Sequence, residues 1–186
     1  MELKSTAKIN IGLHVYNKRQ DGFHNIATIF QEINFFDTIN IREAKNFSCK
    51  TSTGQIKQED NFSTKAFNLI KEAFPHIPNV DIDIKKNIPT NAGLGGGSSN
   101  GTSVLRGLNT FFDLSLNNDE LSEFASKVSS DSTFFVNGGL QLGTKKGEEL
   151  IPILETEIPK HILLVYPNIK ISTKDAFKQL KNHLLN

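Results

Sequence analysis

The stretch IPTNAGLGGGSSN, residues 88–100, places four glycines within the five positions 93–97. Each glycine costs conformational entropy on folding, so such a run in an ordered segment indicates that the backbone takes positive φ or approaches another group closely. A flexible linker is the alternative interpretation. The segments on either side of the stretch distinguish the two.

Both flanking segments have the pattern of core-forming elements. Residues 80–84 alternate apolar and acidic side chains, which predicts a strand. After the glycines, apolar side chains recur at helical spacing: Val104, Leu105, Leu108, Phe111 and Phe112. A loop that joins a strand to a helix is no linker, and we expect Ser98 or Ser99 to cap the helix. Free N–H groups and the positive end of the helix dipole would then face a phosphate or another anion, with a purely structural turn as the alternative.

The glycine stretch matches neither of two familiar phosphate motifs. A Walker A loop ends in Gly-Lys-Ser/Thr, and no lysine follows these glycines. The dinucleotide fingerprint G-x-G-x-x-G, begun at Gly93, requires a glycine where Ser98 stands. The sequence therefore predicts a different kind of phosphate loop.

Other segments predict an antiparallel sheet packed against helices. Apolar residues at every second position predict a strand with one core face: Ala7, Ile9, Ile11, Leu13 and Val15. The turn signal at residues 20–22 separates this strand from two further predicted strands, 26–36 and 38–42. A helix with one apolar stripe is expected to begin after Asn61 as its cap and to end before Pro75.

Composition limits the classes of function. The chain has 186 residues, 37% hydrophobic and 22% charged, which fits one domain with a real core, or one domain plus part of another. A net charge of +1 gives no global field for nucleic acid or an anionic membrane, so neither partner is expected. The chain has no apolar run of membrane-spanning length and no signal-peptide pattern, and a lone Cys49 makes neither a disulfide framework nor a zinc cluster. We expect a cytoplasmic location and no metal site built by the chain itself.

Three motifs, in the right order, resemble those of the GHMP kinases and, more narrowly, of the 4-diphosphocytidyl-2-C-methyl-D-erythritol kinase family. Residues 89–99 resemble the superfamily pattern P-x-x-x-G-L-G-S/G-S/G-S. Residues 7–10 and 21–24 are similar to the narrower family's A-K-[IL]-N and D-G-[YF]-H pair, and residues 130–135 resemble its G-A/S-D-x-P-F-F element. A predicted buried strand at 161–166 also fits, so the resemblance spans nearly the whole chain.

The resemblance implies an α+β fold, the ribosomal S5 domain 2-like N-terminal domain of the GHMP kinases. This ATP-binding domain would occupy residues 1–158, and residues 159–186 would begin a truncated C-terminal domain. The family's third motif, a C-terminal glycine-rich loop, is absent from the sequence. An apolar stripe within residues 172–185 would then lack a partner, so we expect homodimers or aggregates, weak nucleotide binding and little turnover.

The resemblance also implies an activity. It is the transfer of the γ-phosphoryl group of ATP, with Mg²⁺ accompanying the nucleotide, to the 2-hydroxyl of a cytidine diphosphate-linked methylerythritol in non-mevalonate isoprenoid biosynthesis. Asp131 would be the general base and Lys8 its cationic partner. The glycine stretch would bind the ATP phosphates, through Pro89, Thr90, Asn91, Ala92, Gly93, Leu94, Gly95, Gly96, Gly97, Ser98 and Ser99.

The implied acceptor site depends on single residues. His24 would bond to the cytosine edge, Phe23 would stack near the base, and Phe177 would stack on its other side. Asn10 would orient Lys8 or the substrate.

Other interpretations stay open at the level of sequence. Without the family pattern, Lys8 and Asp131 are most simply a solvated lysine and a loop aspartate, and His24 a turn histidine bonded to backbone. The chain could be a non-catalytic nucleotide-binding lobe, another GHMP kinase of the mevalonate or homoserine type, or, with least support, an RNA-binding protein. Ser129 and Thr133 replace the family's usual glycine and proline, which predicts a less constrained backbone around Asp131.

Overall fold

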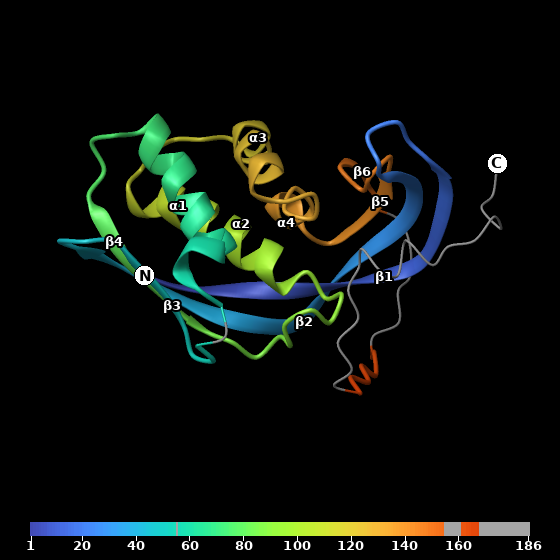
Figure 1. Ribbon diagram of the computed structural model, residues 1–186, viewed down its shortest axis with the longest axis horizontal. Helices are drawn as coiled ribbons and strands as arrows, with labels where there is room; N and C mark the ends of the chain where they lie inside the picture. Colours follow the sequence, from blue (N-terminus) through green and yellow to red (C-terminus); the bar gives the residue numbers. More distant parts are fainter. Residues whose placement is uncertain (55, 155–160, 168–186) are drawn as a thin grey trace.

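The computed structural model describes residues 1–54, 56–154 and 161–167. In this part of the chain one sheet is covered on one face by helices, which confirms the predicted α+β architecture (Figure 1). The sheet order is β3-β4-β2-β5-β6, with β1 pairing to β2, and only the β3–β4 pair is parallel. The strands are β1 Glu2–Lys18, β2 His24–Ala44, β3 Ser48–Thr51, β4 Asn79–Lys85, β5 Leu140–Thr144 and β6 Glu149–Pro152. The helices are α1 Phe62–Ala73, α2 Gly96–Phe111, α3 Asn118–Val128 and the short α4 Phe134–Asn137, with a 3-10 turn at Gln58–Asp60.

Strand β2 is continuous where the sequence predicted two strands, 26–36 and 38–42, so that division is wrong. The residue at the expected break, Asp37, continues the ladder opposite Ser5 on β1. Its side chain is fully buried and forms an ion pair with Lys86. A buried carboxylate with partners can therefore occupy a position in a strand without ending it.

The prediction of one core face along β1 is correct only for the first part of the strand. Ala7 is fully buried, whereas Ile11 and Leu13 are 41% and 47% exposed. The difference follows from the shape of the β1–β2 hairpin, which extends beyond the helices and curls toward β5 and β6 (Figure 1).

The two predicted helices begin differently. Asn61 caps α1 as expected, because its side-chain oxygen accepts a hydrogen bond from the Ser63 N–H at 2.9 Å. The expectation that Ser98 or Ser99 caps α2 is wrong. The N-cap is Gly95, whose φ of +68° is left-handed, and the Ser99 N–H already donates to the Gly95 carbonyl at 2.9 Å. Glycine adopts this conformation at little cost, so the helix begins before the serines.

Three clusters of buried side chains hold the fold together. The largest packs α1, α2 and α3 on the sheet and includes Ile39, Ile41, Ile82, Leu105 and Leu108. A second cluster joins Ala7 to Ile88 and Leu94, which lie at the start and in the middle of the glycine stretch. A third contains Phe30, Phe134 and Phe135. The second and third clusters fix the two segments that form the site described below.

The last described segment differs from its prediction. Residues 161–167 form no strand, and Leu163 and Val165 are 89% and 76% exposed, so the expected buried strand is wrong. A strand requires a paired neighbour, and no described residue pairs with this segment. The boundary expected at residue 159, the apolar stripe at 172–185 and Phe177 all lie outside the described residues, so the predictions made from them stay predictions. Among the described residues, no helix has the length and apolar character needed to cross a membrane.

Candidate active site

The glycine loop, defined here as residues 89–95, connects the end of β4 to the start of α2. Its backbone takes positive φ at Asn91, Gly93 and Gly95, with values of 60°, 75° and 68°. Because Gly95 accepts the first helical hydrogen bond, from Ser99, the N–H groups of residues 96–98 precede the helical ladder. Together with the positive end of the α2 dipole, they form a site suited to an anion.

A cavity of about 420 Å³ opens beside the glycine loop, within the size range of small-molecule sites. One wall comes from the loop and the first turn of α2. The rest of the lining comes from Ile56, from residues 60–62, from Lys86 and from Asn100. Of the residues expected to bind ATP, those from Pro89 to Ser98 line this cavity. Ser99 does not; its side chain is buried and pairs its hydroxyl with that of Ser5 at 2.8 Å.

Lys8 and Asp131, which are far apart in the sequence, lie together beside the loop. The Lys8 ammonium is 3.6 Å from an Asp131 carboxylate oxygen. The Lys8 side chain is 8% exposed and the Asp131 side chain 37% exposed. The lysine also stands over the Phe30 ring, 5.3 Å from its centroid. The pair is therefore a mostly buried cation beside a carboxylate that solvent and ligands can reach.

Asn10 fixes the direction of the Lys8 side chain. Its Oδ1 accepts a hydrogen bond from the Lys8 ammonium at 2.7 Å, and its Nδ2 donates to the Thr28 hydroxyl at 2.8 Å. The Thr28 hydroxyl donates in turn to the Gly12 carbonyl at 2.7 Å. This chain of hydrogen bonds agrees with the expected role of Asn10 in orienting Lys8.

The loop that carries Asp131 is attached to α2 by hydroxyl groups. Ser129 donates to the Ser98 hydroxyl at 2.8 Å, and Thr102 donates to the Ser132 carbonyl at 2.8 Å. Serine and threonine replace glycine and proline in this loop, and the prediction of a less constrained backbone stays a prediction. The Ser129 side chain connects the loop to the first turn of α2.

The expected acceptor residues lie at the far end of the β1–β2 hairpin. Phe23 is 56% exposed, and the ammonium of Lys146 stands 5.3 Å from its ring centroid. Partial desolvation raises the pKa of Asp21, but hydrogen bonds from the Phe23 N–H and from Arg19 outweigh it and hold that pKa below its ordinary value. His24 is the first residue of β2, opposite Lys18. The structure thus places Phe23 and His24 at the end of the hairpin, apart from the Lys8–Asp131 pair.

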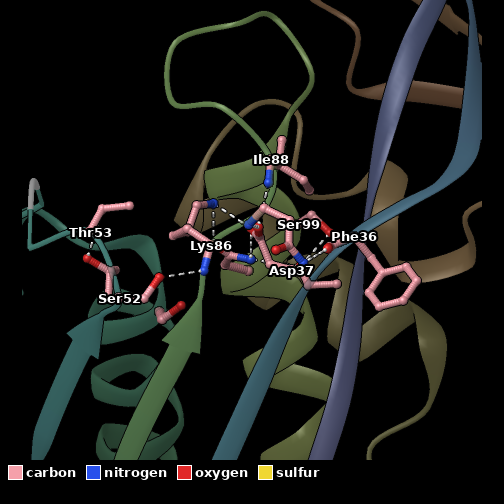
Figure 2. Close-up of polar contacts among 12 residues, drawn as sticks. Phe36, Asp37, Ser52, Thr53, Lys86, Ile88 and Ser99 are labelled. Atoms are coloured by element: carbon pink, nitrogen blue, oxygen red, sulfur yellow. Dashed lines mark hydrogen bonds and ion pairs between the residues drawn. The ribbon is translucent and has the colours of Figure 1, made fainter. Parts of the chain in front are cut away.

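Sequence reasoning missed a buried polar network below the glycine loop (Figure 2). It centres on Asp37, with Lys86 and Asn100 as side-chain partners. Its one sequence signal was the acidic residue inside the apolar pattern of β2. That signal was interpreted as a break between strands rather than as a buried charge.

The described residues offer a nucleotide the N–H groups at the start of α2 and the nearby Asp131 carboxylate. Among them no group of three or more His, Cys, Asp or Glu side chains could hold a metal ion. Mg²⁺ in nucleotide sites is commonly bound by one or two carboxylates together with phosphate oxygens. A Mg²⁺ site of this kind therefore does not need three ligating side chains from the protein. Asp131 is a partly exposed carboxylate beside the anion site.

Comparisons with known proteins agree with this geometry. A family model described as the GHMP kinases N terminal domain matches residues 61–140. The chain is 39% identical over 184 residues to a 4-diphosphocytidyl-2-C-methyl-D-erythritol kinase of Persephonella marina, covering 98% of this chain and 67% of that protein. It is 40% identical over 183 residues to the kinase of the same name from Sulfurihydrogenibium sp., covering 98% and 66%.

A solved structure gives the same result at the level of the fold. The crystal structure of a 4-(cytidine 5'-diphospho)-2C-methyl-D-erythritol kinase matches with a TM-score of 0.80 and 26% identity, over 98% of this chain and 65% of that one. The chain thus spans about two thirds of the length of the proteins it matches.

Proposed function

Since the chain belongs to the 4-diphosphocytidyl-2-C-methyl-D-erythritol kinase family of GHMP kinases, we propose that it phosphorylates the 2-hydroxyl of that methylerythritol compound with ATP. The observation that carries the proposal is the position of Lys8. Its backbone N–H donates to the Leu94 carbonyl at 3.0 Å, and its ammonium lies 3.6 Å from Asp131. One residue therefore connects the loop that suits the phosphates to the carboxylate that suits the acceptor hydroxyl.

The geometry supports a division of roles among the residues. Asp131 is exposed enough to accept the proton of an acceptor hydroxyl as a general base. Lys8, held by Asn10, places a positive charge where negative charge develops on the transferred group. The free N–H groups at the start of α2 bind phosphate oxygens. When bound, ATP supplies the phosphoryl group and Mg²⁺ screens its charge.

The hairpin geometry supports an elongated acceptor. Asn10 on β1 pairs with Phe30 on β2, and His24 begins the same strand. The strand contour from His24 to Phe30 is about 20 Å at about 3.3 Å per residue, although the curl of the hairpin shortens the direct path. A nucleoside diphosphate joined to a polyol is long enough to place its base at Phe23 and His24 and its hydroxyl at Asp131.

The decisive experiment replaces the proposed base. We expect Asp131→Asn to lower the single-turnover rate by about 100-fold or more, because a general base typically contributes about 10²–10⁴-fold. Product formation from ATP and the cytidine diphosphate-linked acceptor would be followed by mass spectrometry. Asp83→Asn is the matched control, since Asp83 lies on β4 with its side chain 45% exposed, in a surface pair with Arg42. A rate for Asp131→Asn equal to that of the control would contradict the assignment.

The acceptor is tested by ligand protection against heat. Cytidine diphosphate should raise the melting temperature by mass action, and His24→Ala should remove that rise. His76→Ala, at an exposed histidine remote from the hairpin, should keep it. Equal protection by mevalonate or homoserine would instead favour another GHMP kinase activity.

A further inference from the structure

The Asp37 carboxylate lies where the glycine loop leaves the sheet. The pairing of β4 with β2 ends at Lys85 and Thr38, so the next residue of β2 is Asp37. Its Oδ1 accepts the backbone N–H groups of Asn87 at 2.7 Å and Ile88 at 2.9 Å. This one side-chain oxygen thus replaces the ladder partners that the two amides lack beyond the end of β4.

The other carboxylate oxygen reaches the helix at the far end of the loop. Asp37 Oδ2 accepts the Asn100 amide at 2.9 Å and also pairs with the Lys86 ammonium. Asn100 belongs to α2 and also donates to the Ser5 hydroxyl at 2.9 Å. A single buried side chain of β2 therefore holds the segment before the glycine loop and the helix after it (Figure 2).

Lys86 is a charge partner in this network rather than a free cation in the cavity. Its side chain is 5% exposed, and its ammonium donates to Asn100 Oδ1 at 3.1 Å. The ammonium also lies 3.4 Å from the point where a Cβ on Gly96 would stand, directly below the start of α2. A cation is disfavoured at a helix N-terminus, so the carboxylate of Asp37 is needed to keep it there.

We propose that Asp37 is a positioning residue for nucleotide binding. By holding both ends of the glycine loop, it fixes the direction of the N–H groups that receive the phosphates. The inference rests on the proposed function, because it assigns the loop to ATP. It goes beyond that function in assigning a role to a fully buried residue that is not among those lining the cavity.

The test separates the hydrogen bonds of Asp37 from its charge. The Asn double variant, Asp37→Asn with Lys86→Met, removes both charges, and its Asn oxygen still accepts the backbone N–H groups of Asn87 and Ile88. The Asn100 amide can turn over so that its oxygen faces the new Asn. In Asp37→Ala with Lys86→Met the charges also leave together, but the acceptor for Asn87 and Ile88 is lost.

We expect the Ala double variant to bind ATP about tenfold more weakly or worse than the Asn double variant in calorimetry; because both variants lack Lys86, which lines the cavity, the comparison does not depend on that lysine. Ile82→Ala is the stability control, because Ile82 is fully buried in β4 away from the loop and its loss should lower the unfolding midpoint without changing ATP affinity. Equal ATP affinity of the Ala and Asn double variants would overturn the proposal.

Two further measurements keep the test decisive. If the Ala double variant does not fold, Asp37→Glu keeps the charge but displaces the carboxylate, and it should weaken ATP binding about tenfold; parent-like binding would overturn the proposal.

Amide hydrogen exchange in residues 93–98 needs no nucleotide. Faster exchange in these residues in the Ala double variant than in the Asn double variant supports the positioning role of Asp37. This support does not require the parent to bind ATP. If the parent does not bind ATP, only the proposed function fails. Equal exchange contradicts the role.

Discussion

Gly95 permits a direct test of how tightly the glycine loop packs on Lys8 and Phe135. A Cβ at this position would lie 2.9 Å from Phe135 Cζ and 3.1 Å from Lys8 Cγ, and the residue has a φ of +68°. Gly93 is a matched control, because its φ is +75° but a Cβ there would have no heavy atom within 4 Å. The two alanine variants therefore share the backbone strain and differ in the steric contact.

The expected magnitudes follow from these two effects. A left-handed conformation costs a non-glycine residue about 1–2 kcal/mol, so Gly93→Ala should lower the free energy of unfolding by about that amount. Gly95→Ala adds overpacking of about 1–3 kcal/mol, for a total loss of about 2–5 kcal/mol. Because relief of the contact requires Lys8 or Phe135 to shift, Gly95→Ala should also reduce phosphoryl transfer more than Gly93→Ala does.

Urea unfolding, monitored by far-UV circular dichroism, gives the free energies, and the single-turnover assay gives the rates. The result that would refute the reasoning is a Gly95→Ala variant no less stable and no less active than Gly93→Ala. In that case the loop would stand further from Lys8 and Phe135 than the structure places it.

Three further predictions concern two titratable groups outside the site, Cys49 and Asp81. Burial raises the pKa of Cys49 to about 11, so iodoacetamide at pH 9 should modify the folded chain far more slowly than the urea-unfolded chain. Because the pKa of Cys49 is higher in the folded chain than in the unfolded chain, the stability that Cys49 contributes is complete below pH 9 and is lost as the pH rises toward 11. Cys49→Ala should remove this decrease of the free energy of unfolding between pH 9 and pH 11. The pKa of Asp81 lies below its ordinary value chiefly through the hydrogen bond from Ser48, so in an NMR titration Ser48→Ala should raise that pKa more than Arg42→Ala does.

The alkylation prediction and the Asp81 prediction each have a clear contrary result. Equal alkylation rates in folded and unfolded chain would mean that Cys49 is accessible. A larger effect of Arg42→Ala would mean that the charge of the guanidinium, rather than the serine hydroxyl, controls the Asp81 carboxyl.

The parts of the fold that the sequence predicted are those encoded by local patterns. Alternation predicted β4, helical spacing and the Asn61 cap predicted α1, and the strand-glycine-helix order predicted the loop. The Lys8–Asp131 pair was predictable only through motifs shared with a family, because nothing in the spacing of residues 8 and 131 indicates contact.

What the sequence did not predict depends on contacts between distant segments. Asp37 has partners 49 and 63 residues away, Lys86 and Asn100, so its local pattern showed only an interruption. The start of α2 was misplaced because serine is a common cap, whereas the φ of Gly95 decides the boundary. The exposure of Leu13 depends on how far the hairpin extends past the helices, which alternation does not encode.

The hydrogen bond from the Lys8 N–H to the Leu94 carbonyl has a consequence for how such a site can change through mutation. A main-chain bond does not depend on the side chains at either position, so substitutions along β1 can change the side chains beside the site without detaching the glycine loop. An inserted or deleted residue in either segment breaks the alignment at once. Divergence at this site should therefore proceed by exchange of side chains at constant spacing, and a change of length in one segment should require a compensating change in the other.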